Sequence, residues 1–434
     1  MTCNFSVAFC DQVDRFGRSP TAPVPIICVP GGCATHFGTT NSGMETKHNH
    51  QGILHLFLPQ KNTEKAMITR FHGIDKHKKY STISVLNRKG EEVEFKQKCF
   101  DLKKYIENLG SEDAVVIESS TGAFCCADQV ESKGALCYVI DPRKFKIIRD
   151  SWNKTDKQDA RNMVKALWIY IVTGEFGIPT VYKPDVVIRA LRKLFSQYQL
   201  LNRQIRMLKN NIQAIVVDNG ITLTKDKKNA LLLPKYGKDI LKRLELPRAS
   251  DISIRGCLEL LWRVKEEKEK IRQEIILAGE PLKEAVKLLI TIKGITPLTA
   301  LAFLADVGDI RRFKTQKKMS AYLGLVPKVK DSGGKSKSGH INRESRKLTR
   351  TILTQSIYHV SNASPVFRKF YVDLTEKRGA GRARIALIRK LCGIMRSMLM
   401  TGECYRWMDD ELFAKKLKIY EKELGNIKME RKTA

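Results

Sequence analysis

The hydrophobic and polar positions along the chain form regular patterns from residue 67 onward. In residues 80–98, apolar and polar side chains alternate on both sides of a turn near Arg88–Gly90, which predicts a β-hairpin. Short apolar runs predict further strands at 67–75, 114–119 and 136–141. Helical spacing of apolar residues predicts helices at 101–110, 126–134 and 154–171. Strands followed by alternating helices and strands predict an α/β sheet with helices on its faces, and we assign it to a domain over residues 67–183.

Residues 184–285 carry two heptad runs. The first begins after Pro184-Asp185 and has its apolar positions at alternating spacings of four and three: Val187, Leu191, Leu194, Tyr198, Leu201, Ile205, Leu208 and Ile212. The second has the same alternation from Cys257 to Ala278 and includes Lys268, an unusual charge for such a seam. Either the runs form a coiled coil between chains, or they pack on each other as a helical hairpin within one chain. The pattern in residues 218–256 is mixed and remains unassigned.

The last part of the chain is predicted to be mainly helical. Residues 288–310 place apolar helical positions on both sides of "KGIT", which predicts a helix-hairpin-helix in a domain over residues 286–408. Residues 409–434 have the pattern of a charged helical tail and contain no functional motif.

Composition adds a strong charge. The 434 residues include 78 Lys and Arg against 46 Asp and Glu, a formal net charge of +32. This excess indicates a polyanionic partner, and nucleic acid is favoured over a membrane surface. The sequence has no apolar stretch of 18 residues, so no transmembrane helix is predicted. The 11 cysteines are odd in number and form no CxxC pair, which excludes a typical secreted disulfide framework and favours a reducing cytoplasm.

Residues 1–66 differ from the rest of the chain. They show no helical or strand period, and we expect a disordered or non-native leader, with Met67 as the true start. Cys28, Cys33, His48 and His50 could bind zinc, but their spacing matches no standard zinc finger.

The positive charge concentrates in residues 311–350, which carry 13 Lys and Arg against 2 acids. Glycine and serine interrupt this run in "DSGGKSKSGH", so we expect a mobile loop that grips phosphate, although a solvated charged surface is the alternative. Gly294 would let the backbone approach a phosphate closely, unless it forms a plain helical turn. The predicted nucleic-acid-binding residues are Lys293, Gly294, Lys335, Lys337, Arg343 and Arg346.

Four carboxylates are candidates for a metal site. Asp75 and Glu118 lie at or near the ends of apolar strands, where an unpaired carboxylate is costly. Asp156 and Asp159 share one face of a predicted helix with Thr155 as its N-cap, so their Cβ atoms should lie roughly 5–6 Å apart. Gathered carboxylates repel one another and favour a cation, and oxygen ligands select Mg²⁺ or Mn²⁺. Each acid taken alone also fits an ordinary structural role.

Three strings carry a family resemblance by their order: "GID" at 73–75, "IESSTGAF" at 117–124 and "KTDKQDA" at 154–160. Together they resemble the DEDD insertion-sequence transposases, which are bridge-RNA-guided recombinases. The resemblance implies a resolvase-like, ribonuclease-H-type fold for residues 67–183. It also implies that the matching acids bind metal and act in catalysis: Asp75, Glu118, Asp156 and Asp159.

Residues 321–350 resemble the second domain of the same transposases. By residue type, the candidates for a nucleophile are equivalent: Ser332, Ser336, Ser338 and Ser345. The family places its nucleophilic serine in the "SG" that follows "GLxP", so the resemblance selects Ser332. The family usually has glycine where Ser345 stands, and we expect a serine to start a helix there equally well.

The resemblance implies a transposase, a site-specific DNA recombinase of a mobile element. Ser332 would form a phosphoserine ester with DNA, and Mg²⁺ or Mn²⁺ would activate the phosphate. The implied partners are DNA and a guide RNA, in the cytoplasm of a prokaryotic cell and associated with the nucleoid. Two-ended DNA reactions need paired protomers, so we favour a dimer or tetramer joined by the heptad runs. The rivals are a metal-only junction resolvase or nuclease, and a non-catalytic nucleic-acid-binding protein.

Overall fold

The computed structural model describes residues 68–145, 155–175, 177–332, 335–341, 345–362 and 364–433. The leader expected over residues 1–66, with its zinc interpretation, and Arg343 lie outside the described residues. Within the part of the chain that is described, no helix combines the length and the apolar character needed to cross a membrane.

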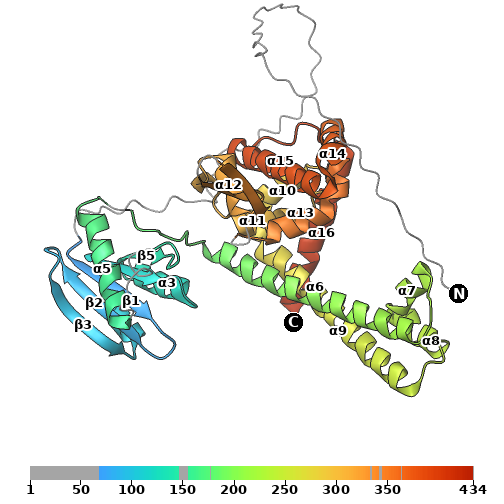
Figure 1. The fold of residues 1–434 in the computed structure, drawn as a ribbon, viewed down its shortest axis with the longest axis horizontal. Coiled ribbons are helices and arrows are strands. Elements are labelled where there is room, and N and C mark those ends of the chain that lie inside the picture. Colours follow the sequence, from blue (N-terminus) through green and yellow to red (C-terminus); the bar gives the residue numbers. More distant parts are fainter. Residues whose placement is uncertain are drawn as a thin grey trace, which may run out of the picture. The chain divides into compact units, whose positions relative to one another are not determined.

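The N-terminal α/β domain contains one five-stranded sheet with the order β3-β2-β1-β4-β5 (Figure 1). Its strands are β1 Arg70–Lys76, β2 Ser81–Asn87, β3 Glu92–Cys99, β4 Asp113–Glu118 and β5 Leu136–Ile140. Strand β1 pairs antiparallel with β2 and parallel with β4, β2 pairs antiparallel with β3, and β4 pairs parallel with β5. The predicted hairpin is confirmed as β2 and β3, and Gly90 in its turn has φ 84°. The mixed α/β sheet is therefore confirmed, while its assignment as ribonuclease-H-like stays a prediction.

Helices cover both faces of this sheet. They are α2 Leu102–Glu107, α3 Ala123–Ser132 and α5 Asp156–Val172. Ile74 of β1 and Ile117 of β4 pack with α2 and α3, whereas alternate residues of the same strands pack with α5. Asp75 and Glu118 each follow one of these isoleucines. Because successive side chains on a strand point to opposite faces, both acids are directed toward the face that carries α5.

Helix α5 approaches the sheet closely because β1 has glycine in its middle. A Cβ built on Gly73 would lie 2.3 Å from the carbonyl oxygen of Ala160 and 2.8 Å from Cβ of Val164. Any side chain at this position would therefore push α5 away. The close approach brings the first turn of α5, with Asp156 and Asp159, to the end of β1 that carries Asp75.

The substitution Gly73→Ala is expected to destabilise the domain. The added methyl would overlap main-chain atoms of α5, and overpacking of this kind costs about 1–3 kcal/mol or more. Denaturant unfolding of the wild-type and variant chains measures the loss. Gly110→Ala is the matched control, because a Cβ on Gly110 would meet nothing within 4 Å. Equal stability of Gly73→Ala and wild type would contradict the close docking of α5.

The heptad runs form a helical hairpin within the chain. Its arms, α6 Val186–Asp218 and α9 Arg248–Ala278, pack on each other. The seam residues Leu191 and Ile275 lie in one buried cluster, and both are 0% exposed. Lys268 Nζ lies 5.1 Å from the ring centroid of Tyr198, so the unusual charge makes a cation–π contact with the opposite arm. The structure thus shows the intramolecular alternative, and the heptads no longer support the preference for pairing between chains.

Residues 218–256, left unassigned by their pattern, include two short helices that close the hairpin at its tip. These are α7 Lys225–Leu231 and α8 Pro234–Lys242. Leu231 and Leu241 are buried in a cluster with Ile212 of α6 and Leu258 of α9. The tip therefore has its own small apolar core.

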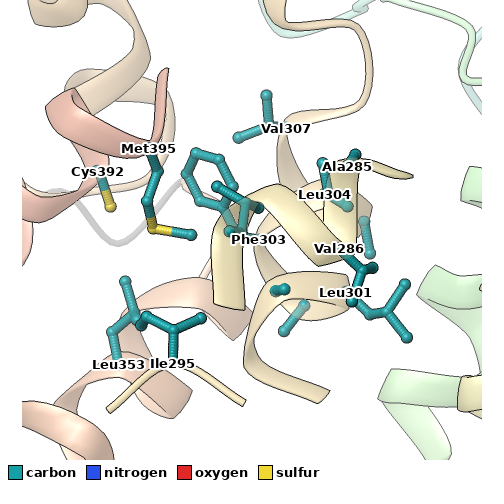
Figure 2. Packing of buried hydrophobic residues seen from close by; sticks show 14 of the residues in the cluster. Ala285, Val286, Ile295, Leu301, Phe303, Leu304, Val307, Leu353, Cys392 and Met395 are labelled. Carbon is teal, nitrogen blue, oxygen red and sulfur yellow. The ribbon is translucent and has the colours of Figure 1, made fainter. Parts of the chain in front are cut away.

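The C-terminal region is mainly helical, as predicted. Its elements are η2 Glu280–Leu282, α10 Lys283–Ile290, α11 Pro297–Val307, η3 Ile310–Arg312, α12 Gln316–Tyr322, β6 Pro327–Ser332, β7 Lys335–Ile341, α13 Leu348–Ser361, α14 Pro365–Arg378, α15 Ala380–Thr401 and α16 Asp410–Thr433. Every residue of α11 from Thr299 to Val307 is at most 4% exposed, as expected for a helix that is apolar on all sides. Figure 2 shows Phe303 of this helix near Met395 of α15, in the core that the helices share.

The predicted charged tail is confirmed as helix α16, which packs onto this core. Tyr420 is 0% exposed, and Lys416 Nζ donates hydrogen bonds to the carbonyl oxygens of Ile290 at 2.7 Å and Ile292 at 2.8 Å. Burial lowers the pKa of Lys416 to about 8. The tail therefore supplies a hydrogen-bond donor to the carbonyl groups at the C-terminal end of α10, in addition to its charged surface.

The prediction of a loop at "DSGGKSKSGH" is wrong for the described residues of this segment, which lie in strands, whereas its contact with phosphate stays a prediction. Helix α12 is followed by β6 and β7, which form an antiparallel pair. Main-chain hydrogen bonds between the strands order a segment whose glycine and serine content favours a loop. The expectation that Ser345 starts a helix is also wrong, since α13 begins at Leu348 with Lys347 as its N-cap residue.

Candidate functional site

Three potential metal ligands converge where β1 ends. Thr155 is the N-cap of α5, as predicted, and it sets Asp156 as the first residue of the helix. His77 Nε2 lies 3.1 Å from Oδ2 of Asp75 and 3.1 Å from Oδ2 of Asp156. The hydroxyl of Tyr80 donates a hydrogen bond to the same Asp156 oxygen at 3.1 Å. One ligand atom from each of Asp75, His77 and Asp156 lies within 4.8 Å of the others.

The electrostatics of Asp75 fit a cation site. Asp75 is 7% exposed, and this burial raises the pKa of its carboxyl group. The negative charges of Asp156 and Asp159 raise that pKa further, whereas His77 opposes the shift. Ionised carboxylates this close to one another are stable only when a positive charge lies between them. His77 contributes part of that charge when it is protonated, and a divalent cation would contribute more.

Glu118 and Asp159 lie around the same edge of the sheet. In the parallel pairing of β1 and β4, Ile74 lies opposite Ile117, so Glu118 occupies the position beside Asp75. Asp159 is one helical turn beyond Asp156, and its charge acts on Asp75. The structure therefore gathers all four predicted acids from β1, β4 and α5. Their roles as metal ligands stay predictions.

His77 is the residue that the sequence patterns missed. Only its position two residues after Asp75, in the turn that follows β1, could have drawn attention to it. Its nitrogen and the two carboxylates make a mixed donor set in a half-buried site. Carboxylate oxygens suit Mg²⁺ and Mn²⁺, and imidazole nitrogen binds transition metals more readily than Mg²⁺. The donor set thus fits a divalent metal, with Mn²⁺ the better match where His77 is a ligand.

The second sequence motif lies on the β6–β7 hairpin. Ser332 is the last residue of β6, and its register partner is Lys335, the first residue of β7. Lys337 pairs with Lys330 in the same register. The backbone thus places Ser332 at the end of the hairpin, with a lysine at the opposite position of the ladder. Its role as nucleophile stays a prediction.

Arg346 belongs to an arginine cluster around Tyr322. Arg192 Nη2 lies 3.5 Å from the Tyr322 hydroxyl, and the guanidinium carbon of Arg312 lies 4.2 Å from the Tyr322 ring centroid. Burial alone would raise the pKa of Tyr322, but the charges of Arg192, Arg312 and Arg346 outweigh it and lower that pKa. The nearby carboxyl group of Asp306 is buried, and it accepts two hydrogen bonds from Thr349, each 2.8 Å long. Positive charge therefore dominates around this hydroxyl.

Gly294 lies in the turn between α10 and α11, with φ 87°. A Cβ there would lie 2.9 Å from the backbone nitrogen of Val360 and 3.0 Å from the carbonyl carbon of His359. Close packing on α13 is thus sufficient to require glycine at this position. Lys293 is exposed beside it. The helix-hairpin-helix assignment and the phosphate contacts of both residues stay predictions.

Comparison with known proteins bears on the segment that holds the β6–β7 hairpin and two members of the arginine cluster, Arg312 and Arg346. Residues 286–372 match the family model described as "Transposase IS116/IS110/IS902 family". The chain is also 27% identical over 304 residues to the transposase for insertion sequence element IS1111A of Coxiella burnetii, a match that covers 67% of this chain and 79% of the relative. The chain is thus similar to transposases of insertion sequences, and residues 286–372 carry the family match.

Two further relatives are named as a transposase and as a gene-inverting protein. A probable family 20 transposase of Pseudomonas aeruginosa is 23% identical over 302 residues, or 67% of this chain and 85% of the relative. The pilin gene-inverting protein of Moraxella bovis is 28% identical over 220 residues, or 42% of this chain and 68% of the relative. The comparisons therefore support an enzyme of the DNA transposase and recombinase class.

Proposed function

We propose that the chain is a site-specific DNA recombinase that moves an insertion sequence by cutting and rejoining DNA. The observation that carries the proposal is the convergence of Asp75, His77 and Asp156 in a chain whose residues 286–372 match a transposase family. Carboxylates grouped around a divalent metal are suited to phosphodiester chemistry. The net charge of +32 suits a nucleic-acid substrate.

The proposed nucleophile is the hydroxyl group of Ser332. Its oxygen bonds to a DNA phosphorus as its proton leaves, the bond from phosphorus to the departing deoxyribose oxygen breaks, and that oxygen takes up a proton. The phosphodiester is exchanged for a phosphoserine ester, so a second strand can reverse the step without ATP. A metal ion bound by Asp75 and Asp156, together with Glu118 and Asp159, would stabilise charge on the phosphate oxygens. Arg346 and the lysines of the hairpin are proposed to hold DNA phosphates.

Two partners follow from the resemblance noted in the sequence. A guide RNA is proposed to pair with the DNA, and the positive charge of the chain is compatible with an RNA partner. A dimer or tetramer is proposed because joining two DNA ends needs paired active sites. The α6–α9 seam is filled within the chain, so this assembly would have to use other surfaces.

A metal-only resolvase or nuclease is the second candidate function, favoured by the acidic site taken alone. In that case water attacks the phosphate and Ser332 is a bystander. A non-catalytic nucleic-acid-binding protein would retain every activity when the acids are neutralised. The three functions therefore differ in which residues their activity needs.

Metal removal tests the shared premise of the two enzymatic functions. The full chain is incubated with RNA transcribed from its insertion sequence and with a plasmid that carries both ends of that element, and the cleaved and rejoined strands are quantified. We expect EDTA to stop the reaction, and Mg²⁺ or Mn²⁺ to restore it, because the acids repel one another without a cation. Full activity in excess EDTA would contradict the metal site.

A further inference from the structure

A row of aromatic rings leads from solvent to the acidic site. Phe100, which follows β3 directly, is 74% exposed. Its ring centroid lies 6.3 Å from that of Tyr80 at an interplanar angle of 66°, and the Tyr80 centroid lies 5.0 Å from that of His77. Tyr80 and His77 both contact Asp156. The outer ring thus has a free face to solvent, and the inner rings contact the candidate metal ligands.

The strand register explains why the rings meet. Ser81 at the start of β2 pairs with Cys99 at the end of β3, so Tyr80 and Phe100 flank the same rung of the ladder. Strand β3 lies at the edge of the sheet, which leaves Phe100 without a neighbouring strand beyond it. A single exposed phenylalanine is common on protein surfaces. What distinguishes Phe100 is its ring contact with Tyr80, which itself contacts Asp156 of the acidic site.

The charge around this row suits nucleic acid. Lys78 and Lys79, in the turn before Tyr80, are exposed, as are Lys98 and Lys103 on either side of Phe100. The nearest acid in sequence, Asp101, accepts a hydrogen bond from the backbone nitrogen of Lys104 at 3.0 Å and caps α2. Exposed aromatic rings among lysines are the combination by which proteins bind single-stranded nucleic acid, because the rings stack on bases and the lysines hold phosphates.

We propose that Phe100, supported by Tyr80, stacks on an unpaired base of the DNA strand whose phosphate lies at the acidic site. A paired base inside a duplex presents no free face, so this surface selects a strand that is melted or distorted at the cleavage point. The stacked base would fix the position of the neighbouring phosphate relative to Asp75 and Asp156. The inference rests on the proposed DNA cleavage at this site.

Fluorescence of 2-aminopurine measures stacking without any need for cleavage. The probe is a short single-stranded DNA of arbitrary sequence with one 2-aminopurine, titrated with the full chain. We expect quenching by wild type and by Phe100→Trp, which keeps a ring. Phe100→Leu keeps an apolar side chain but no ring, and it should lose the quenching and bind about tenfold more weakly. Val93→Ala is the matched control, because Val93 lies on the same edge strand, is 56% exposed, and lies away from the ring row.

Several outcomes would overturn the stacking surface. The first is quenching and binding by Phe100→Leu equal to those of wild type, and the second is quenching with RNA but not with DNA. The third is a molecular mass in solution that differs between Phe100→Leu and wild type, because it would show that Phe100 contacts a second copy of the chain. The cleavage assay separates the two proposals: DNA cleavage that persists in a chain without stacking refutes the stacking surface alone. Stacking in a wild-type chain that never cleaves DNA refutes the proposed function.

Discussion

Replacing Asp75 with asparagine is expected to lower DNA cleavage by about a thousandfold or more, while the protein remains folded. The asparagine keeps the size of the side chain at this buried position but removes the charge that holds the cation. It also removes the repulsion from Asp156 and Asp159, which raises the pKa of the Asp75 carboxyl group. Stability should therefore stay the same or increase. Strand cleavage on the plasmid substrate and thermal unfolding measure the two quantities side by side.

Glu107→Gln provides the matched control for Asp75→Asn. Glu107 is an exposed acid at the end of α2, which packs on the other face of the sheet. Its neutralisation changes the net charge of the protein by the same amount, so it should leave cleavage unchanged. If Asp75→Asn cleaved DNA at the wild-type rate, the Asp75 carboxylate would be structural and the proposed role of this acid in a catalytic metal site would be wrong.

The substitution Ser332→Ala is expected to abolish covalent attachment to DNA and to reduce strand transfer by about a thousandfold or more, because removal of a nucleophile eliminates the covalent route. The hairpin should remain intact, since the pairing of Ser332 with Lys335 uses the main chain. Strand-transfer products and denaturing gels of protein–DNA adducts measure the loss.

Ser336→Ala and Ser338→Ala are the controls for this substitution, because both residues lie on β7 of the same hairpin. They test two of the three serines that residue type alone could not separate from Ser332. Cleavage that persists in Ser332→Ala and still depends on metal would favour the metal-only nuclease, in which water is the nucleophile.

The sequence predicted the sheet well because its signals are local. The Val-Val-Ile run marks β4 as a buried strand, and the structure confirms it. Residues 80–98 also form the predicted hairpin, although β2 is buried on both faces and β3 is largely exposed. The acids were found because each stands next to such a pattern. His77 was missed because a histidine in a turn has no periodicity, and only the fold brings it between Asp75 and Asp156.

The heptad runs show a different limit of sequence patterns. A period of seven residues shows that a helix has an apolar face, but it does not identify the helix that covers this face. Here α6 is covered by α9, and Lys268 fits the seam because Tyr198 lies opposite. Similarly, Gly294 suggested a phosphate contact, yet the close neighbour that excludes a side chain there is the backbone of α13.

The β6–β7 hairpin shows why composition misled. Glycine, serine and lysine within residues 327–341 favour a loop individually, but each strand receives its hydrogen bonds from the other. Such pairing depends on the position of the turn between the strands, and the hydrophobic pattern does not predict that position. The family resemblance, not the pattern, therefore selected Ser332.

The most direct measurement maps the residue that carries DNA in a trapped protein–DNA adduct. The full chain is incubated with Mg²⁺, with RNA transcribed from its insertion sequence and with DNA that contains the ends of that element. The reaction is then denatured, and digested peptides are analysed by mass spectrometry. We predict a nucleotide linked through phosphate to Ser332, formed with Mg²⁺ and absent with EDTA or in Asp75→Asn. An adduct on another residue, or efficient strand transfer with no adduct at all, would contradict the serine mechanism.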